Sequence, residues 1–505
     1  MTKMDSQKVQ LCFDSNRKYI KLFFGLCIMY SLYVLPIVLA GRYKSDDLAR
    51  SVTGLTGWTG DGRPLTQALV ELLSCWESAI DLFPLPLFLS VILLAGIITI
   101  YIRHNLPSFK VNLAMVFAFS LVITNPFMLE NLSYHFDVLS MVLAFCIALV
   151  PFILPGNIHY IVLALVTAGA VICELSLYQV VICASLSLLA LDIFLKITSR
   201  VGWRRFISIF SGIVVGAVFY GKVIAPTCIK QGDWRYQASG LKNFFRAEDR
   251  AQILANYYGM KGLLKTYLLS VPAIVLVIAG AGIILGMISV ITSIWKQSQF
   301  SSRARVFKTV YILMLPVILY ICNFLPMAFL TSGATKSRAL LSVCVFEIWI
   351  AVLLLYLFNN HALMYGVAVT FCLGFAYIYS YAYGTAVKSQ GEYEKMVAYD
   401  LVYDIESINK NQNYTEITIV GDAPRSQQSA RIIQRFPQFG ELIQPCPENE
   451  WWTSGSMLYH YMQYDLGFAT LDEADQEVMK GDCVIDNFLY SIYVHDQKII
   501  VKYKS

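Results

Sequence analysis

The sequence predicts a polytopic α-helical membrane protein with a small C-terminal α/β domain. Three observations support this prediction: 57% of the 505 residues are hydrophobic, only 14% are charged, and long apolar runs recur over the first three quarters of the chain. Soluble proteins carry roughly 25% charged residues. A mean hydropathy of +0.57 therefore indicates that lipid is the solvent for much of this chain.

Eleven apolar runs are long enough to cross a bilayer as helices, which takes about 17–25 residues each. The first follows a polar N-terminus without a small-residue cleavage site, so we expect it to be retained as a helix. Only Glu174 and Ser176 separate the fifth and sixth runs, and these two could instead form one bent element. The runs fall at 20–40, 83–102, 110–126, 136–153, 157–173, 176–195, 205–225, 269–294, 307–330, 338–358 and 362–383.

Basic residues gather in alternate loops, which sets the expected orientation. With eleven helices, every strongly basic loop falls on the side of the N-terminus, and that side is predicted to be cytoplasmic. The loops 41–82, 127–135, 226–268 and 331–337 and the tail then lie outside. The basic residues are Lys3, Lys8, Arg17, Lys18, Lys21, Arg103, Lys110, Lys196, Arg200, Arg204, Arg205, Lys296, Arg303, Arg305 and Lys308.

The charge balance changes sign along the chain and predicts two domains. Residues 1–384 hold 29 Lys and Arg against 16 Asp and Glu, whereas residues 385–505 hold 10 against 18. We predict a transmembrane domain over 1–384 and a soluble extracytoplasmic α/β domain over 385–505. The expected elements of the second domain are a strand near 416–422, helices over 425–436 and 454–465, and a hairpin over 486–503.

The first outer loop carries adjacent carboxylates, Asp46 and Asp47, just beyond a membrane helix, with Arg50 on the same helical face. Charges at a membrane boundary are costly unless they have a partner or a function. One interpretation is an exposed salt bridge of little energetic value. The other is a general base, which sugar transfer needs to take the proton from an attacking hydroxyl.

The pattern Asp46-Asp47-x-x-Arg50, followed by Gly57-Trp58 and then Gly62-Arg63-Pro64-Leu65, resembles the serotype-converting O-antigen glucosyltransferases, the GtrII-like group of the polytopic GT-C class. The stretch Leu175-Ser-Leu-Tyr178-Gln179 and the segment 332–338 with its basic residues are similar to the same group. The likeness covers most of residues 20–385, and the first loop is its most specific part.

This resemblance implies a donor, an acceptor and a place for the chemistry. The donor is undecaprenyl phosphate carrying a sugar, usually glucose, and the acceptor is a lipid-linked O-antigen repeat of lipopolysaccharide. The site lies at the periplasmic face of a bacterial inner membrane, and no cofactor is implied. Asp46 or Asp47 is the base, and the sequence does not decide between them. Residues of the same motifs are predicted to bind substrate, namely Arg50, Trp58, Arg63, Tyr178 and Gln179.

The second outer loop adds Glu130, His135 and Asp137 at the mouth of the third and fourth runs. We predict a catalytic role for Glu130 and Asp137 and a substrate-binding role for His135. The alternative is that these polar residues, together with Tyr134, anchor two helix ends at the membrane interface.

Two cations, Lys336 and Arg338, stand on the outer side, against the usual charge bias. Arginine can grip a phosphate with two parallel hydrogen bonds, so we predict that this pair binds the donor phosphate, Arg338 foremost. The alternative is a pair of side chains that snorkel to the lipid headgroups.

Two further segments are rich in aromatic residues. Residues 226–268 mix basic and aromatic side chains, as expected of a segment that lies on the outer leaflet. In the tail, Trp451, Trp452, Tyr459 and Tyr461 could stack on sugar rings, although aromatic residues of a small domain more often form its core.

The predicted reaction is a single displacement that inverts the anomeric carbon. The twelve cysteines contain no CxxC and no Cys/His cluster, so no metal site is predicted. Expected partners are membrane lipids, a donor-synthesising glycosyltransferase and a donor flippase, with no nucleic acid. One rival is a flippase or exporter of lipid-linked glycan without catalysis. Buried charges within the helices would favour it, but the spans hold few, mainly Asp192 and Glu347, and charge gathers in the outer loops instead. Another is an acyl transferase, for which only His135 could act as base.

Overall fold

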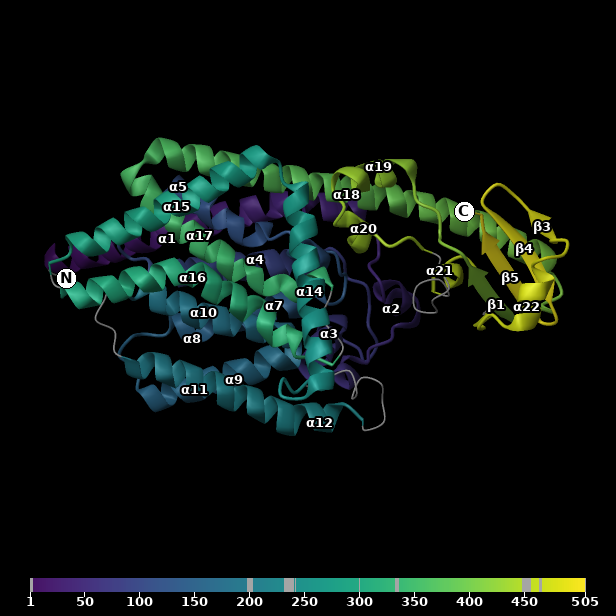
Figure 1. The fold of residues 1–505 in the computed structure, drawn as a ribbon, viewed down its shortest axis with the longest axis horizontal. Coiled ribbons are helices and arrows are strands. Elements are labelled where there is room, and N and C mark those ends of the chain that lie inside the picture. The colour runs from purple at the N-terminus through teal and green to yellow at the C-terminus, as the bar shows by residue number, and fades with distance from the viewer. Residues whose placement is uncertain are drawn as a thin grey trace.

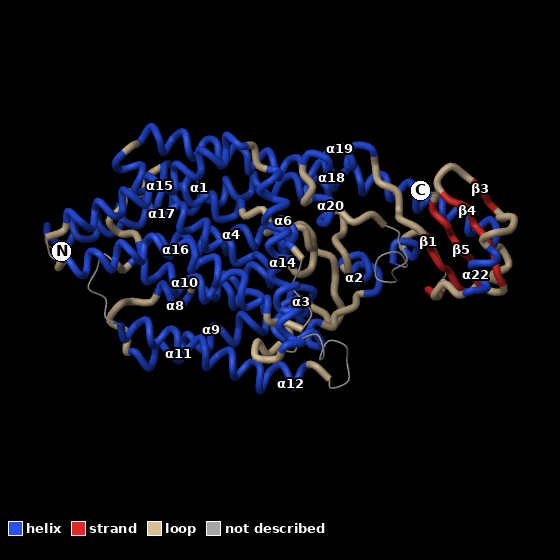
Figure 2. The backbone as a smooth tube through the Cα atoms, viewed as in Figure 1, coloured by secondary structure: helices blue, strands red, loops and turns tan. Residues whose placement is uncertain are grey.

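The computed structural model shows a long helical bundle that ends in a small β-sheet (Figures 1 and 2). The N-terminus lies at the end of the bundle that faces away from the sheet (Figure 1). The structure describes residues 3–197, 203–230, 240, 242–298, 300–331, 336–446, 456–462 and 466–504.

Each of the eleven predicted runs corresponds to a helical segment, but the segments differ in length. Eight helices of the described chain are long and apolar enough to cross a membrane. Three predicted runs form shorter apolar helices, Leu113–Thr124, Val138–Ala148 and Gln179–Leu195. The chain is therefore a polytopic helical membrane protein, and the count of eleven spans stays a prediction. The helices that occupy the runs are α1 (Lys3–Ala40), α4 (Leu85–Asn105), α5 (Leu113–Ser120) with η2 (Leu121–Thr124), α7 (Val138–Ala148) with α8 (Val150–Ile153), α9 (Tyr160–Leu177), η3 (Gln179–Val181) with α10 (Ile182–Leu195), α11 (Trp203–Phe219) with the π-helical turn Tyr220–Ile224 and α12 (Ala225–Cys228), α15 (Ala273–Lys296), α16 (Ser302–Ala328), η5 (Ser337–Val343) with α17 (Cys344–Asn360), and α18 (Ala362–Ile408).

The basic loops meet at the N-terminal end of the bundle. The Arg103 guanidinium lies 5.5 Å from the ring centre of Tyr19 near the start of α1. Lys308 donates a hydrogen bond to the carbonyl of Ile197, and Arg205 donates to the carbonyl of Pro151. The predicted grouping of these loops on one side thus has a structural counterpart, whereas the compartment that this side faces stays a prediction.

Small residues allow close contact between neighbouring helices. A Cβ atom at Gly212 or Gly216 of α11 would lie 2.6 Å from a backbone carbonyl of α9, at Ala164 and Ala168 respectively. Membrane helices gain little from hydrophobic burial against one another, so close backbone contact at small residues is a main source of their association. The glycines explain how α9 and α11 pack along their length.

Helix α18 joins the bundle to the sheet. Its 47 residues make a helix of about 70 Å, more than twice the hydrocarbon thickness of a bilayer. The predicted domain division at residue 384 falls inside this helix. Its last turns, with Val397, Leu401 and Ile405, share a buried cluster with Ile417 and Ile499 of the sheet.

The sheet contains five strands in the order β2-β1-β5-β4-β3. Strand β1 pairs in parallel with β2 and β5, and β4 pairs with β5 as an antiparallel hairpin. The predicted strand near 416–422 and the predicted hairpin are both present, and the predicted helix at 454–465 is described only as α21. The bounds are β1 (Glu416–Val420), α21 (Ser456–Tyr459), β2 (Gly467–Phe468), α22 (Glu473–Val478), β3 (Ile485–Asp486), β4 (Tyr490–His495) and β5 (Lys498–Tyr503).

The segment between β1 and α21 returns to the bundle. It contains α19 (Gln427–Arg435) and α20 (Phe439–Leu442), and its side chains Phe436, Phe439 and Ile443 belong to the main core of the bundle. This segment belongs to the predicted soluble domain 385–505. In the structure it packs on the bundle, at the end of the membrane helices that faces the sheet (Figure 1).

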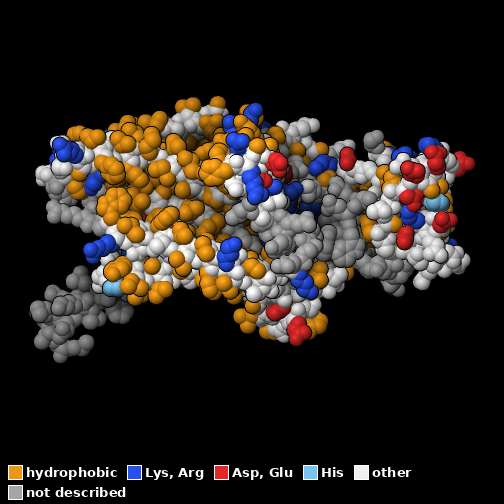
Figure 3. Space-filling view, turned by 60° about the horizontal axis from the view of Figure 1, so that its bottom comes forward, with side chains coloured by type: hydrophobic (Ala, Val, Ile, Leu, Met, Phe, Trp, Pro, Cys, Tyr) orange, Lys and Arg blue, Asp and Glu red, His pale blue; other side chains and the backbone are white. Residues whose placement is uncertain are grey.

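The surface separates the two parts of the molecule. Figure 3 shows hydrophobic side chains over the bundle and a mixture of acidic and basic side chains over the sheet. Helix α14 (Ala247–Ser270), within the aromatic loop 226–268, runs across the direction of the bundle helices (Figure 1). That course suits a segment lying along a membrane surface.

Candidate functional site

The first carboxylate, Asp46, precedes α2 (Asp47–Thr53), a short helix that ends at Gly54 with a positive φ of 67°. Arg50, one turn on, donates two hydrogen bonds of 2.9 and 3.1 Å, both to Oδ2 of Asp46. Arg50 is itself held by the carbonyls of Leu55 and Thr56 and lies 3.8 Å from the ring centre of Trp58. Within the described chain Oδ1 of Asp46 has no hydrogen-bond partner, and this side chain is 32% exposed. The predicted ion pair is therefore present, and it leaves one carboxylate oxygen open.

The second carboxylate, Asp47, is fully buried. Its Oδ2 accepts a hydrogen bond of 2.8 Å from the backbone N–H of His135 in the second outer loop. Its Oδ1 has no hydrogen-bond partner in the described chain. Burial raises the pKa of Asp47 well above its ordinary value, and the neighbouring charge of Asp46 raises it further. Asp47 thus joins the two outer loops, whereas Asp46 is the one that faces solvent.

The Gly-Trp and Gly-Arg-Pro parts of the motif hold Asp137. The indole N–H of Trp58, in η1 (Trp58–Asp61), donates to Oδ1 of Asp137 at 2.9 Å, and Arg63 donates to the same oxygen at 2.8 Å. Gly62 has a φ of 75°, and a Cβ there would lie 2.8 Å from the hydroxyl of Tyr220. The turn at Gly62 aims Arg63 inward, and Pro64 opens α3 (Pro64–Ser74). Trp58 and Asp137 are buried, so they lie behind the site surface.

His135 sits in a row of rings beside the first loop. It stacks on Phe83 with ring centres 3.9 Å apart, and Tyr43 lies 4.7 Å away. Its Nδ1 is 3.0 Å from a carboxylate oxygen of Asp81. Burial acts to raise the pKa of Asp81, but the hydrogen bond and charge of His135 outweigh it and lower this pKa. These contacts fix His135 as part of a wall.

Glu130, in α6 (Met128–Leu132), connects the second loop to the cationic pair. Its Oε2 accepts a 2.7 Å hydrogen bond from the backbone N–H of Arg338, and its Oε1 is 3.9 Å from Nζ of Lys44. The Arg338 guanidinium donates to the hydroxyl of Tyr134. Burial raises the pKa of Tyr134, the charge of Arg338 lowers it, and the charges of Glu130 and Asp46 raise it. The charges of both Asp46 and Arg338 act on this one hydroxyl, so both residues lie in the neighbourhood of Tyr134.

Tyr178 and Gln179 support the backbone at Arg338 and at Asp61. The Tyr178 hydroxyl donates to the carbonyl of Arg338 at 3.0 Å, and the Gln179 amide donates to the carbonyl of Asp61 at 2.8 Å. Lys336 is exposed beside Arg338. All twelve residues predicted for the site therefore lie in loops, short helices and helix ends, and several of them contact one another rather than open space.

Two further charged residues, Lys44 and Glu441, lie at the candidate site and were not predicted from the sequence. Lys44 is buried, and its Nζ donates to the carbonyl of Leu442, the last residue of α20, at 2.7 Å. Burial lowers the pKa of Lys44 to about 8, although Glu130 acts to raise it. Glu441 accepts a hydrogen bond from the backbone of Ser337, next to Arg338. A cation beside the acidic pair could have been noted, but no local pattern reveals the contact with residues 441–442.

The comparisons decide the family. Residues 35–380 match the family described as glucosyl transferase GtrII. The chain belongs to the GtrII glucosyl transferase family. A protein of Salmonella phage P22, described as an uncharacterized 55.3 kDa protein in the gtrB 5′ region, is 25% identical over 503 residues, covering 97% of this chain and 99% of the relative. No solved structure matches the chain.

The structure describes only some of the aromatic residues that were predicted to stack on sugars. Trp451 and Trp452 lie outside the described residues, as does the side chain of Tyr459. Tyr461 packs against Tyr399 of α18 with ring centres 4.4 Å apart. The proposed stacking of these residues on sugars therefore stays a prediction.

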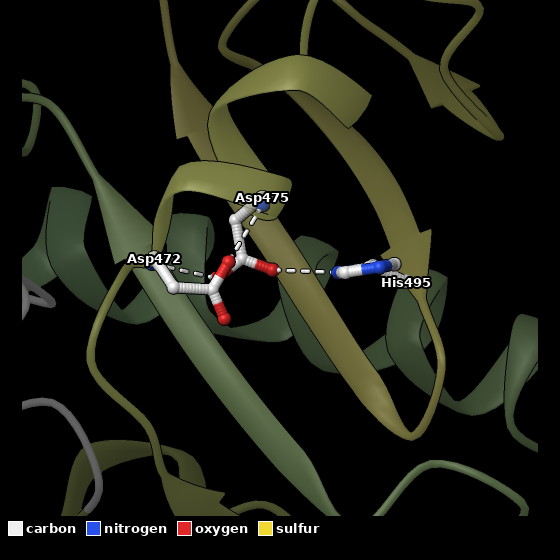
Figure 4. Close-up of side chains that lie close together, drawn as sticks. All are labelled: Asp472, Asp475 and His495. Atoms are coloured by element: carbon white, nitrogen blue, oxygen red, sulfur yellow. Dashed lines mark hydrogen bonds and ion pairs between the residues drawn. The ribbon is translucent and has the colours of Figure 1, made fainter.

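A cluster of possible metal ligands lies in the sheet domain of the GtrII protein, away from the site. Figure 4 shows Asp472, Asp475 and His495 converging, with Nδ1 of His495 at 3.0 Å from Asp475. Nζ of Lys498 lies 2.7 Å from Asp475 and 3.3 Å from Asp472. The ammonium group occupies the position of a cation, and Asp472 and Asp475 cap α22 reciprocally. The two aspartates therefore have a structural role, because they cap α22 and pair with Lys498.

Proposed function

We propose that this protein transfers a glucosyl unit from undecaprenyl phosphate to a lipid-linked O-antigen repeat. The family supports a glycosyltransferase, and the bundle supports a lipid-borne substrate. The observation that carries the proposal is Asp46, whose Oδ2 is held by Arg50 while its Oδ1 has no hydrogen-bond partner in the described chain, with the Arg338 guanidinium bound to Tyr134 of the neighbouring loop. A fixed carboxylate beside a fixed cation is what displacement at a phosphate-activated sugar needs.

The proposed step is one displacement. The acceptor hydroxyl gives its proton to Oδ1 of Asp46 as its oxygen attacks the anomeric carbon. The bond between that carbon and the phosphate oxygen breaks, and the electron pair leaves with the polyprenyl phosphate, whose charge Arg338 holds with help from Lys336. The anomeric centre inverts. A phosphate whose charge is held is a good leaving group, so the proposed step uses neither a metal ion nor a cofactor.

The other carboxylates position this machinery. Asp47 is buried and accepts a hydrogen bond from the backbone of the second loop, and Glu130 accepts one from the backbone of Arg338. Asp137 accepts a hydrogen bond from Trp58, whose ring lies against the guanidinium of Arg50. The structure therefore favours Asp46 as the base. Arg63, His135, Tyr178 and Gln179 shape the walls of the site in this proposal.

The proposal extends to the setting of the reaction. We place the protein in a bacterial inner membrane with a GT-C-like arrangement of about eleven spans, the N-terminus in the cytoplasm and the sheet domain in the periplasm. The phage relative is described as lying in the gtrB 5′ region, and such a gtr neighbourhood suits a role in O-antigen modification and serotype conversion. A donor-synthesising enzyme and a donor flippase are then the expected partners.

The test is transfer of radiolabelled glucose from polyprenyl phosphate in membranes that contain the full chain. We expect labelled lipid-linked glycan from the wild type. Arg338→Lys keeps the charge but loses the two-pronged grip, and we expect it to slow transfer about tenfold. Arg338→Ala should slow it about 100-fold or more. Consumption of the donor without covalent product, or movement of glycan across the membrane without transfer, would reject the proposal in favour of a transporter.

A further inference from the structure

A cavity of about 410 Å³ lies beside the site, between the end of α1, the middle of α18 and the segment that follows α20. Leu39 and Ala40, the last residues of the first membrane helix, line the cavity, so it reaches the end of a candidate membrane span. Lys44 and Ser45, which directly precede Asp46, form part of its wall. A ligand in this cavity would therefore extend from the lipid headgroups toward the proposed base.

The lining of the cavity carries an excess of positive charge. Its cations are Arg42, Lys44, Lys388 and Lys395, and its carboxylates are Glu392 and Glu394. Arg42 and Glu394 neutralise each other through two hydrogen bonds of 2.8 and 2.9 Å. Lys388 lies 3.9 Å from Glu392, both exposed, and the described residues give Lys395 no ion pair. Such exposed pairs are weak, so two lysines can turn toward an anion.

This charge is unusual for the expected location. Loops on the outer side of a membrane protein are generally poor in Lys and Arg, so a cationic cavity there indicates an anionic ligand. The wall also carries rings suited to a sugar: Tyr43 stacks on His460 with ring centres 5.9 Å apart and an angle of 20° between the planes. A ligand with both a phosphate at the membrane surface and sugar beyond it matches this lining.

Resting on the proposed function, we infer that this cavity binds the phosphate-bearing headgroup of the acceptor lipid, with Lys388 and Lys395 facing the phosphate. The first sugars of the acceptor pass Tyr43 and His460 on the way to Asp46. The donor phosphate lies at Arg338, which does not line the cavity. Acceptor and donor are thus held by separate sets of cations.

The decisive variant is the double substitution Lys388→Ala/Lys395→Ala. Both side chains are exposed on α18, so their removal leaves the packing of the helix unchanged. The matched control is Lys410→Ala/Lys480→Ala, which removes two exposed cations of the tail that do not line the cavity. Each full-length protein is placed in nanodiscs of phosphatidylcholine alone and in nanodiscs that also contain phosphatidylglycerol.

Two readouts separate this inference from the proposed function. The first is binding of lipid-linked O-antigen repeats, extracted from the host bacterium, to the protein without donor, measured by native mass spectrometry. The second is the KM for acceptor and for donor during transfer. We expect the double variant to weaken acceptor binding and raise the acceptor KM about tenfold in both bilayers, with the donor KM and kcat unchanged.

Three results would overturn the inference: unchanged acceptor binding, a rise in the donor KM instead, or an effect that disappears in the neutral bilayer. The last would mean that the cavity binds anionic bulk lipid. If the wild type binds the acceptor but transfers no sugar, the proposed function fails, and the binding measurement still tests the cavity.

Discussion

Replacing Asp46 with Asn separates the roles of the two adjacent carboxylates. The substitution keeps the shape of the side chain and removes the proton acceptor, so we expect transfer to fall about 10²–10⁴-fold, the usual contribution of a general base. The fold should tolerate the change. Arg50 keeps its bonds to two backbone carbonyls and its contact with Trp58, and a carboxylate that is 32% exposed contributes only about 0.2–1 kcal/mol through its ion pair.

The matched substitution is Asp47→Asn. An amide oxygen can still accept the N–H of His135, whereas the new NH2 group would take the place of Oδ1, which has no partner among the described residues. The amide leaves a donor without a partner where the carboxyl leaves an acceptor, and it also removes the buried charge whose cost raises the pKa of Asp47, so the two effects oppose each other. We therefore expect a thermal midpoint near that of the wild type and transfer within about tenfold of it.

The assay for both variants is initial-rate transfer of radiolabelled glucose, normalised to folded protein in the membrane. Chromatographic monodispersity and the thermal midpoint in detergent report on folding. If Asp47→Asn abolishes transfer while Asp46→Asn retains most of it, the assignment of Asp46 as the base is refuted. Full activity in both variants would exclude a base in this loop.

Two further predictions concern stability. Gly384→Leu should lower the thermal midpoint and the yield of folded protein, because a Cβ at this position would lie 2.3 Å from Cβ and 2.7 Å from the carbonyl oxygen of Pro36. Gly374→Leu serves as the control, since a Cβ there meets open space. Equal behaviour of the two variants would contradict the close packing of α1 and α18. The other prediction concerns pH in the sheet domain. Burial acts to raise the pKa of Asp475, but hydrogen bonds from Lys498, the backbone of Asp472 and His495 lower this pKa to about 2. The same hydrogen bond to Asp475 raises the pKa of His495 above 6.5. Asp475 therefore stabilises the fold above its ordinary pKa of 3.8 and loses this effect as pH falls through about 2, while His495 stabilises below 6.5 and loses the effect as pH rises through its folded pKa. Hydrogen exchange of residues 490–503 in the full chain, corrected for intrinsic rates, should show greatest protection between these limits, and a flat profile would reject the assignment.

The helical bundle could be predicted from the sequence because it depends on local properties. Apolar runs mark the helices, and the spacing of basic loops groups their ends. The three short apolar helices could not be assigned from the sequence. An apolar run of this length can be a membrane span, a re-entrant segment or a buried core helix, and the packing of the neighbouring helices determines which of these forms. The course of α18 past residue 384 was also hidden, because a helix can continue without a change in its local pattern when its polar half packs against a sheet.

The candidate site was predictable to the extent that its residues share a motif. The motif of the first loop placed Asp46, Arg50, Trp58 and Arg63 together, and the grouping of loops brought Arg338 to the same end. Their mutual arrangement was not predictable. Trp58, for example, carries no sequence signal that it donates to Asp137 behind the site instead of facing a sugar.

The tail contributes contacts to the loop that carries Asp46. Lys44 has its closest polar contact at the carbonyl of Leu442, and Arg42 bonds to the carbonyl of Gln444 as well as to Glu394. The partners are 352 to 402 residues away in the chain, and each cation is largely buried, so withdrawal of the tail segment would leave buried charges with fewer partners. The tail segment therefore helps to hold the loop that carries Asp46. Membrane helices supply the frame for the candidate site, but the position of its proposed base also depends on a segment that follows the last of them.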